Sequence, residues 1–161
     1  MIEIFGWFAA SLLVALTVAI HYEVMMAVSD RILPWAQRHL HGRRVMVVSM
    51  ISMLFGHIIE IWLFAFAMKG LMLIHGFGAL TGDFDSDLHA FLYFSAANYT
   101  AIGSEVHAHG PIREIMVSET LTGLMMITWS ASFTYLKMEE IWRGHTKKKH
   151  STDEKDHIKE L

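Results

Sequence analysis

Cysteine is absent from the 161-residue sequence, which excludes a disulfide framework and a thiolate metal site. Charged residues make up only 18% of the chain and gather in short polar segments and in the C-terminal tail, so the net charge of −3 does not indicate a charged partner. The sequence has no basic arm and no nucleic-acid-binding motif. It also lacks a nucleophile–base dyad and a phosphate-binding glycine loop. We therefore expect neither nucleic-acid binding nor enzymatic activity.

Hydrophobic residues, in contrast, make up 53% of the chain, and the mean hydropathy of +0.37 is high for a soluble domain. The length is that of one domain. The 12 methionines suit adaptable packing in an apolar interior. A copper relay is an alternative role for them, but no methionine repeat in the sequence faces a pair of histidines.

Three apolar stretches predict membrane-spanning helices: residues 4–28, 45–68 and 112–135. In the first stretch, Trp7 lies where interfacial aromatic anchors are found. A cleaved signal peptide is the alternative, but it would need a basic start, and the only early charge is Glu3. The expected organisation is an extra N-terminal helix (1–28), a connection (29–44), a central domain (45–140) and a charged tail (141–161).

Between the second and third stretches lies a shorter amphipathic run, FLYFSAANYTAIGSE at residues 91–105. It is too short to cross a bilayer, which takes about 20 residues of helix. A segment that enters the membrane and returns must keep its non-helical end in a cavity or inside protein. We expect a helix over residues 88–98, capped by Asp85 or Asp87, and then a loop of small residues.

This run resembles the pore loop of tetrameric potassium-type channels, whose filter signature is TVGYG. Residues 95–103 follow that family's spacing from pore helix to filter without a gap. The wider likeness, to a small three-span bacterial branch of the family, covers roughly residues 44–140. It implies an all-α membrane protein, homotetrameric, with a re-entrant pore helix and filter loop between the second and third transmembrane helices.

The resemblance assigns the selectivity filter to six consecutive residues: Thr100, Ala101, Ile102, Gly103, Ser104 and Glu105. Ala101 replaces the family's second threonine, which supplies a hydroxyl site at the inner end. Glu105 replaces a glycine that permits left-handed backbone, and a bulky residue is strained in that conformation. The outer half of a potassium filter is therefore not expected to form. Four Glu105 side chains would instead make an anionic ring. This resembles the TIGE pattern of non-selective cyclic-nucleotide-gated channels, although here Ser104 stands between the glycine and the glutamate.

These features imply a weakly selective, potassium-channel-like cation channel. It would carry K⁺ or Na⁺, with a divalent cation at the outer mouth and no bound cofactor, and its partners would be its own copies and the lipid bilayer. The alternative, which the degenerate filter favours, is a non-conducting subunit derived from a channel that scaffolds or associates with a larger membrane complex. The channel would lie in an inner or plasma membrane. Basic residues in segment 29–44 and at Lys147 to Lys149 predict its orientation, with the N-terminus outside and the C-terminus cytoplasmic.

Ionisable residues inside predicted spans usually face protein or a wet cavity. His57 and Glu60 are three residues apart on one helix face, and we interpret them as a hydrogen-bonded brace for the pore helix. A zinc or iron site is the alternative, although no further ligand has a suitable spacing. Glu119 is interpreted as a second brace. A bis-histidine haem site from His21 and His57 is conceivable, but nothing in their spacing argues for it.

Gly123 lies in the middle of the third predicted span, where it could serve either as a hinge of the inner helix or in tight helix packing. The threonines and serines that follow it suit a helix that lines water, although such side chains can also bond their own helix backbone. His107 and His109 are expected at the outer mouth. In a tetramer they would form imidazole rings able to bind a metal or sense pH, or they are simply solvated.

Overall fold

The computed structural model of the protein describes residues 2–40 and 43–159, and for residues 144–159 it describes the helical backbone alone. Most of the described chain is helical. The helices are α1 (Ile2–Ala27), the π-helical turn η1 (Val28–Ile32), α2 (Leu33–His39), α3 (Arg43–Leu71), α4 (Leu88–Tyr99) and α5 (Ile112–Lys159). Two short strands are β1 (Ala79–Thr81) and β2 (His107–His109).

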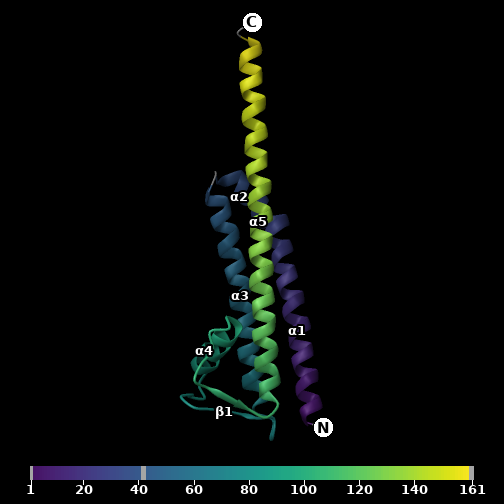
Figure 1. Ribbon diagram of the computed structural model, residues 1–161, viewed down its shortest axis with the longest axis vertical. Helices are drawn as coiled ribbons and strands as arrows, with labels where there is room; N and C mark the ends of the chain where they lie inside the picture. The colour runs from purple at the N-terminus through teal and green to yellow at the C-terminus, as the bar shows by residue number, and fades with distance from the viewer. Residues whose placement is uncertain (1, 41–42, 160–161) are drawn as a thin grey trace.

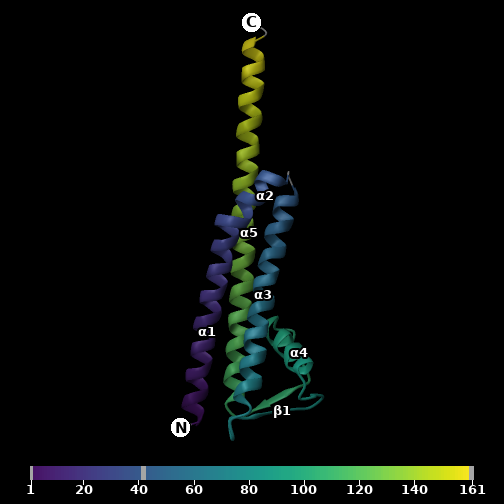
Figure 2. The ribbon, with the colours of Figure 1, turned by 180° about the vertical axis from the view of Figure 1, so that it is seen from behind.

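Helices α1, α3 and α5 run side by side along the long axis of the molecule (Figure 1). The N-terminus, α4 and the strands lie at one end of this bundle, while α2 lies at the other end (Figures 1 and 2). Beyond α2, α5 continues alone to the C-terminus. The described residues of segment 29–44 and of the C-terminal tail therefore lie at the end opposite to α4. The topology in a membrane stays a prediction.

Two helical runs are long and apolar enough to cross a membrane, Ile2–His39 and Arg43–Leu71. At about 1.5 Å per residue, α1 and α3 are each roughly 40 Å long, more than the ~30 Å hydrocarbon core of a bilayer. Large apolar side chains on the outside of both helices are exposed, among them Phe8, Leu12, Leu54 and Phe55. These properties indicate a membrane protein. The third predicted span is the part of α5 that packs against α1 and α3, and it stays a prediction.

Helix α4 begins where the sequence predicts it. The Asp87 side chain accepts a hydrogen bond from the Ala90 backbone N–H at 2.7 Å, which makes Asp87, rather than Asp85, the N-cap. Phe91 and Phe94 bury one face of α4 against the bundle. Helix α4 thus runs from the loop end of the bundle alongside α3 and α5.

Asp87→Ala is expected to lower the free energy of unfolding by about 1 kcal/mol, because an orphan N–H at the start of α4 loses its acceptor. Asp85→Ala is the matched control, since Asp85 is exposed and has no capping bond. Detergent-induced unfolding followed by tryptophan fluorescence measures both. Equal losses of unfolding free energy for the two variants would show that the Asp87 cap does not stabilise the protein.

The loop before α4 contains a short strand, β1, that the sequence does not predict. Ala79, Leu80 and Thr81 pair antiparallel with His109, Ala108 and His107, so a two-stranded ribbon joins the entry and the exit of the α4 segment. Gly78 is needed at the start of the ribbon, because its φ is +140° and a Cβ would lie 2.2 Å from the His109 carbonyl oxygen. Three-residue strands flanked by glycines have no periodic pattern, so the sequence alone does not predict this ribbon.

The connection after α1 and the charged tail are both largely helical. The first helix continues through η1 into α2, with Pro34 in the first turn of α2, where its missing N–H costs nothing. The charged tail continues α5 to Lys159. Extending a helix that has already formed is easier than nucleating one. The side chains of Lys147 to Lys149, on which the predicted orientation partly depends, lie outside the described residues, as do residues 41–42 and 160–161.

Candidate functional site

The segment assigned to a filter forms a tight turn after α4. The N–H groups of Ile102 and Gly103 both donate to the Ala97 carbonyl, at 3.0 and 3.1 Å. The Thr100 hydroxyl donates to the Ala96 carbonyl at 2.7 Å, so it caps its own helix. Positive φ occurs at Ala101 (57°) and Gly103 (79°) but not at Glu105. The strain expected at Glu105 is therefore absent, because the left-handed residues of this loop lie elsewhere.

The backbone carbonyls of Thr100, Ala101, Ile102 and Gly103 accept no hydrogen bond from any described residue. All four residues are exposed, and Ile102 is 82% exposed. Next to them lies an open hollow of about 630 Å³ that contains two carboxylates, Asp83 and Glu105. The loop thus presents free carbonyl oxygens beside an acidic surface.

His107 and His109 lie on the exposed face of β2, with Ala108 between them buried. His109 Nε2 lies 2.8 Å from the Thr81 hydroxyl on the neighbouring strand. Neither histidine lines the acidic hollow or belongs to a group of three possible metal ligands within the described residues. They lie on the ribbon that closes the α4 segment. Their expected position at the outer mouth stays a prediction, because it depends on the proposed assembly.

Gly123 lies where α5 crosses the end of α4. A Cβ at this position would be 2.1 Å from the Tyr99 carbonyl oxygen, so only glycine allows the two helices to approach this closely. This contact supports the packing role of Gly123. Its role as a hinge stays a prediction.

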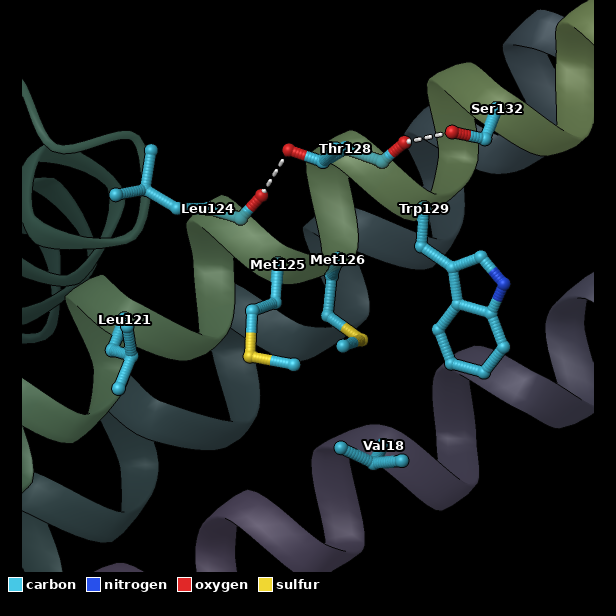
Figure 3. A pocket seen from close by; sticks show the side chains of 8 residues that line it. All are labelled: Val18, Leu121, Leu124, Met125, Met126, Thr128, Trp129 and Ser132. Carbon is cyan, nitrogen blue, oxygen red and sulfur yellow. Dashed lines mark hydrogen bonds between the residues drawn. The ribbon is translucent and has the colours of Figure 1, made fainter.

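The hydroxyl groups on α5 mostly bond their own helix. Thr120, Thr122, Thr128 and Ser132 each donate to the carbonyl four residues earlier. Figure 3 shows two of these bonds beside a groove of about 490 Å³ between α1 and α5, into which Val18, Met125 and Trp129 point. The groove is apolar, so the polar sequence of α5 does not by itself mark a water-lined surface.

The most polar part of the interior is a closed ring of five side chains from four helices, which we call the polar ring: His21, Glu60, Tyr99, His57 and Ser130. Glu60 Oε1 lies 2.8 Å from His21 Nδ1, and Glu60 Oε2 accepts a hydrogen bond from the Tyr99 hydroxyl. The Tyr99 oxygen also lies 2.8 Å from His57 Nδ1. Ser130 Oγ closes the ring, at 3.0 Å from His57 Nε2 and 3.2 Å from His21 Nε2.

The polar ring can be neutral as a whole. Its five hydrogen bonds need five hydrogen atoms, one for each bond. Tyr99, Ser130 and the two neutral imidazoles bring four. The fifth is carried either by the Glu60 carboxyl or by one imidazole that pairs with the Glu60 carboxylate, and the net charge is zero in both cases. Every ring nitrogen and oxygen then has a partner, which makes burial in an apolar interior tolerable.

The polar ring extends the predicted brace. His57 and Glu60 do contact α4, through Tyr99. The sequence missed His21, Tyr99 and Ser130 as their partners, because 39 residues separate His21 from Glu60 and 109 separate His21 from Ser130. His21 itself could have been singled out, because it is an ionisable residue directly after the charge-free apolar residues 4–20. Ser130 Oγ lies within hydrogen-bond distance of both Nε2 atoms, so the two imidazoles meet at a serine here, and nothing in their arrangement argues for a bis-histidine haem.

Glu119 forms a second buried contact with α4. Its Oε1 accepts a hydrogen bond from Ser95, whose hydroxyl also lies 2.8 Å from the Ile61 carbonyl. Glu119 Oε2 has no partner among the described residues. A protonated Glu119 could donate to Ser95 and leave the Ser95 hydrogen for Ile61. The contact joins α3, α4 and α5, as the predicted brace requires.

No protein-family model, curated protein or solved structure matches this chain. The resemblance to potassium-type channels therefore stays a prediction, and the function is argued from the geometry.

Proposed function

We propose that this chain is the subunit of a homotetrameric cation channel in an inner or plasma membrane. The observation that carries the proposal is the set of four consecutive carbonyl oxygens, from Thr100 to Gly103, that accept no hydrogen bond from the described residues. They follow directly on the C-terminal end of a 12-residue helix. The C-terminal end of a helix carries a partial negative charge, and carbonyl oxygens can replace the water around a cation.

One chain provides only one such loop, so symmetry must complete the pore, and a closed cyclic assembly is the economical route. Two exposed apolar side chains beside the free carbonyls support an assembly: Ile102 is 82% exposed and Tyr93 is 70% exposed. Around a four-fold axis the Asp83 and Glu105 carboxylates of each subunit would gather at the mouth. Such a ring of carboxylates would raise the local concentration of cations.

Within this proposal, the N-terminus and the α4 loop face the outside and the C-terminus faces the cytoplasm. The basic residues of segment 29–44 lie at the end of the bundle opposite to α4 (Figure 1). Basic segments are retained on the cytoplasmic side of bacterial and plasma membranes. The orientation can be tested by introducing single cysteines at either end of the bundle and labelling intact cells with an impermeant thiol reagent. The native chain has no cysteine that would react in the background.

A second candidate function, the non-conducting subunit of a larger membrane complex, is favoured by a specific observation. The N–H groups of Ile102 and Gly103 fold back on the Ala97 carbonyl, so the loop is wound close to α4 rather than extended. An extended column of carbonyls would require these two bonds to open. Currents from the purified protein in planar bilayers distinguish the candidates, because the non-conducting subunit passes none.

Glu105→Gln is expected to abolish block by external Ca²⁺ and to lower conductance several-fold at low salt, because four carboxylates would otherwise concentrate cations at the mouth by about 10-fold or more. High salt should shrink the difference, since ions screen exposed charges. Asp85→Asn is the matched control, being exposed but outside the acidic hollow. Single-channel recording measures both variants.

One outcome would contradict the channel, and another would contradict only the anionic ring. Wild-type protein that is tetrameric but passes no current would favour the non-conducting subunit. Conducting channels whose Ca²⁺ block is the same in wild type and Glu105→Gln would remove the anionic ring, although a cation channel without it would remain.

A further inference from the structure

We propose that the polar ring binds one divalent first-row transition metal ion, with His21, His57 and Glu60 as ligands and Tyr99 as the fourth. The possible ligand atoms of the first three residues all lie within 4.8 Å of one another. Glu60 Oε1 lies 2.8 Å from His21 Nδ1, and Glu60 Oε2 lies 3.5 Å from His57 Nδ1. Tyr99 bonds both His57 and Glu60. This site is independent of ion conduction and of the proposed channel.

The spacing of these atoms suits a tetrahedral ion. Zinc bound at about 2.0–2.1 Å by nitrogen and oxygen ligands keeps neighbouring ligand atoms roughly 3.3 Å apart. The two His–Glu distances, 2.8 and 3.5 Å, lie on either side of that value. Side-chain shifts of up to about 1 Å would complete the geometry, because the hydrogen-bonded pairs, above all Tyr99 and Glu60, must move apart once the hydrogens between them leave.

Charge balance favours a divalent ion. The neutral polar ring holds five hydrogens. An M²⁺ ion bound by the Glu60 carboxylate and the Tyr99 phenolate gives a site that is again neutral, so the ion takes the place of two protons, which leave to solvent. The three hydrogens that stay belong to Ser130 and to the Nε2 atoms of the two histidines. A buried site therefore exchanges two protons for one metal without acquiring net charge.

Ser130 supplies the outer hydrogen bonds that such a site needs. Metal-bound histidine almost always donates its other ring N–H to an acceptor, which fixes the orientation of the ring. With both Nδ1 atoms on the metal, both Nε2–H groups would donate to Ser130 Oγ, which lies 3.0 Å from His57 Nε2 and 3.2 Å from His21 Nε2. One serine between the two ligands therefore orients both of them.

The ligand set and its access indicate the class of metal. Two imidazoles, a carboxylate and a phenolate suit Zn²⁺, Fe²⁺ or Cu²⁺ rather than Ca²⁺ or Mg²⁺, which prefer all-oxygen sites. A groove of about 540 Å³ between α3 and α5 reaches His57 and Ser130. Met46, Met50 and Met53 follow one face of α3 along this groove, which is a route for an ion to reach the polar ring.

The test uses the full chain in detergent, loaded with Zn²⁺, dialysed and analysed by mass spectrometry for zinc per chain. Wild type should retain one Zn²⁺ per chain and release about two protons on binding in weak buffer. Glu60→Gln should fold, since its amide can both donate and accept in the polar ring, but should retain no zinc. Ser130→Ala should bind about 10- to 100-fold more weakly, as expected for the loss of an outer hydrogen-bond partner. The double variant His107→Gln/His109→Gln is the control and should bind as wild type does.

Co²⁺ provides a second readout that does not depend on any variant folding. Bound by the four ligands, it should give the intense visible absorption of a tetrahedral site, and added Zn²⁺ should remove that absorption. Wild-type protein that retains no more zinc than Glu60→Gln, or that gives no tetrahedral Co²⁺ spectrum, overturns the metal site. Zinc that disappears with His107 and His109 would be surface binding and would overturn it as well.

Discussion

Glu60→Leu is expected to lower the free energy of unfolding by about 3–5 kcal/mol, because it leaves two buried hydrogen-bonding partners unpaired, whereas Glu60→Gln should keep most of the stability. Glu60 is fully buried and bonds His21 and Tyr99 on either side. Leucine has similar bulk but leaves both partners without a hydrogen bond in an apolar interior. Each such orphan costs about 1–3 kcal/mol.

Glutamine behaves differently because of the hydrogen count in the polar ring. Its amide donates on one side and accepts on the other, as a protonated carboxyl does, so all five bonds can form with every ring member neutral. If Glu60 served only as the negative half of an ion pair with an imidazolium, glutamine would leave that charge uncompensated. Glu60→Gln therefore separates a neutral ring from a fixed ion pair.

Unfolding in mixed micelles, with added sodium dodecyl sulfate as denaturant, measures these differences. Glu23→Leu is the control, because Glu23 lies on the same bundle but is exposed and has no partner in the polar ring. Equal and large losses for Glu60→Leu and Glu60→Gln would rule out the neutral ring. Negligible losses for both would mean that the polar ring has no structural role.

The helices could be anticipated from the sequence because their causes are local. Apolar length predicts α1 and α3, and the aspartates before a short amphipathic run predict α4 with its cap at Asp85 or Asp87, of which the structure selects Asp87. The ribbon was missed, because its pairing joins Ala79 to His109 across the whole α4 segment. Strand pairs this short arise from the closure of the loop rather than from any pattern in either strand.

In the candidate site, too, contacts within one helix could be predicted from the sequence, whereas contacts between helices could not. His57 and Glu60 could be placed together because they are three residues apart on one helix, although Tyr99, which hydrogen-bonds both, was not anticipated. Their partners His21 and Ser130 come from α1 and α5, and only the packing of the three long helices brings them together. Likewise, the sequence shows a glycine at residue 123 but not the Tyr99 carbonyl against it. Contacts between helices depend on their rotation and depth in the bundle, which hydropathy leaves open.

Gly123→Ala is expected to lower the free energy of unfolding by about 3 kcal/mol, at the upper end of the range for overpacked interiors. The added methyl would lie 2.1 Å from the Tyr99 carbonyl oxygen, well inside van der Waals contact. The obstacle is backbone, so no side chain can rotate away, and α4 and α5 must separate. That movement also displaces the Tyr99 hydroxyl, which bonds Glu60 and His57 in the polar ring.

Gly70→Ala is the matched control, because a Cβ there meets nothing within 4 Å and the residue is helical. Alanine is a better helix former than glycine by up to about 1 kcal/mol, so this variant should be as stable as wild type or more so. Unfolding in mixed micelles compares the two variants. Packing of α5 on α4 predicts a large loss for Gly123→Ala alone. A Gly123→Ala protein with wild-type stability but altered channel opening would instead identify Gly123 as a hinge, since alanine would then restrict only the bending of α5.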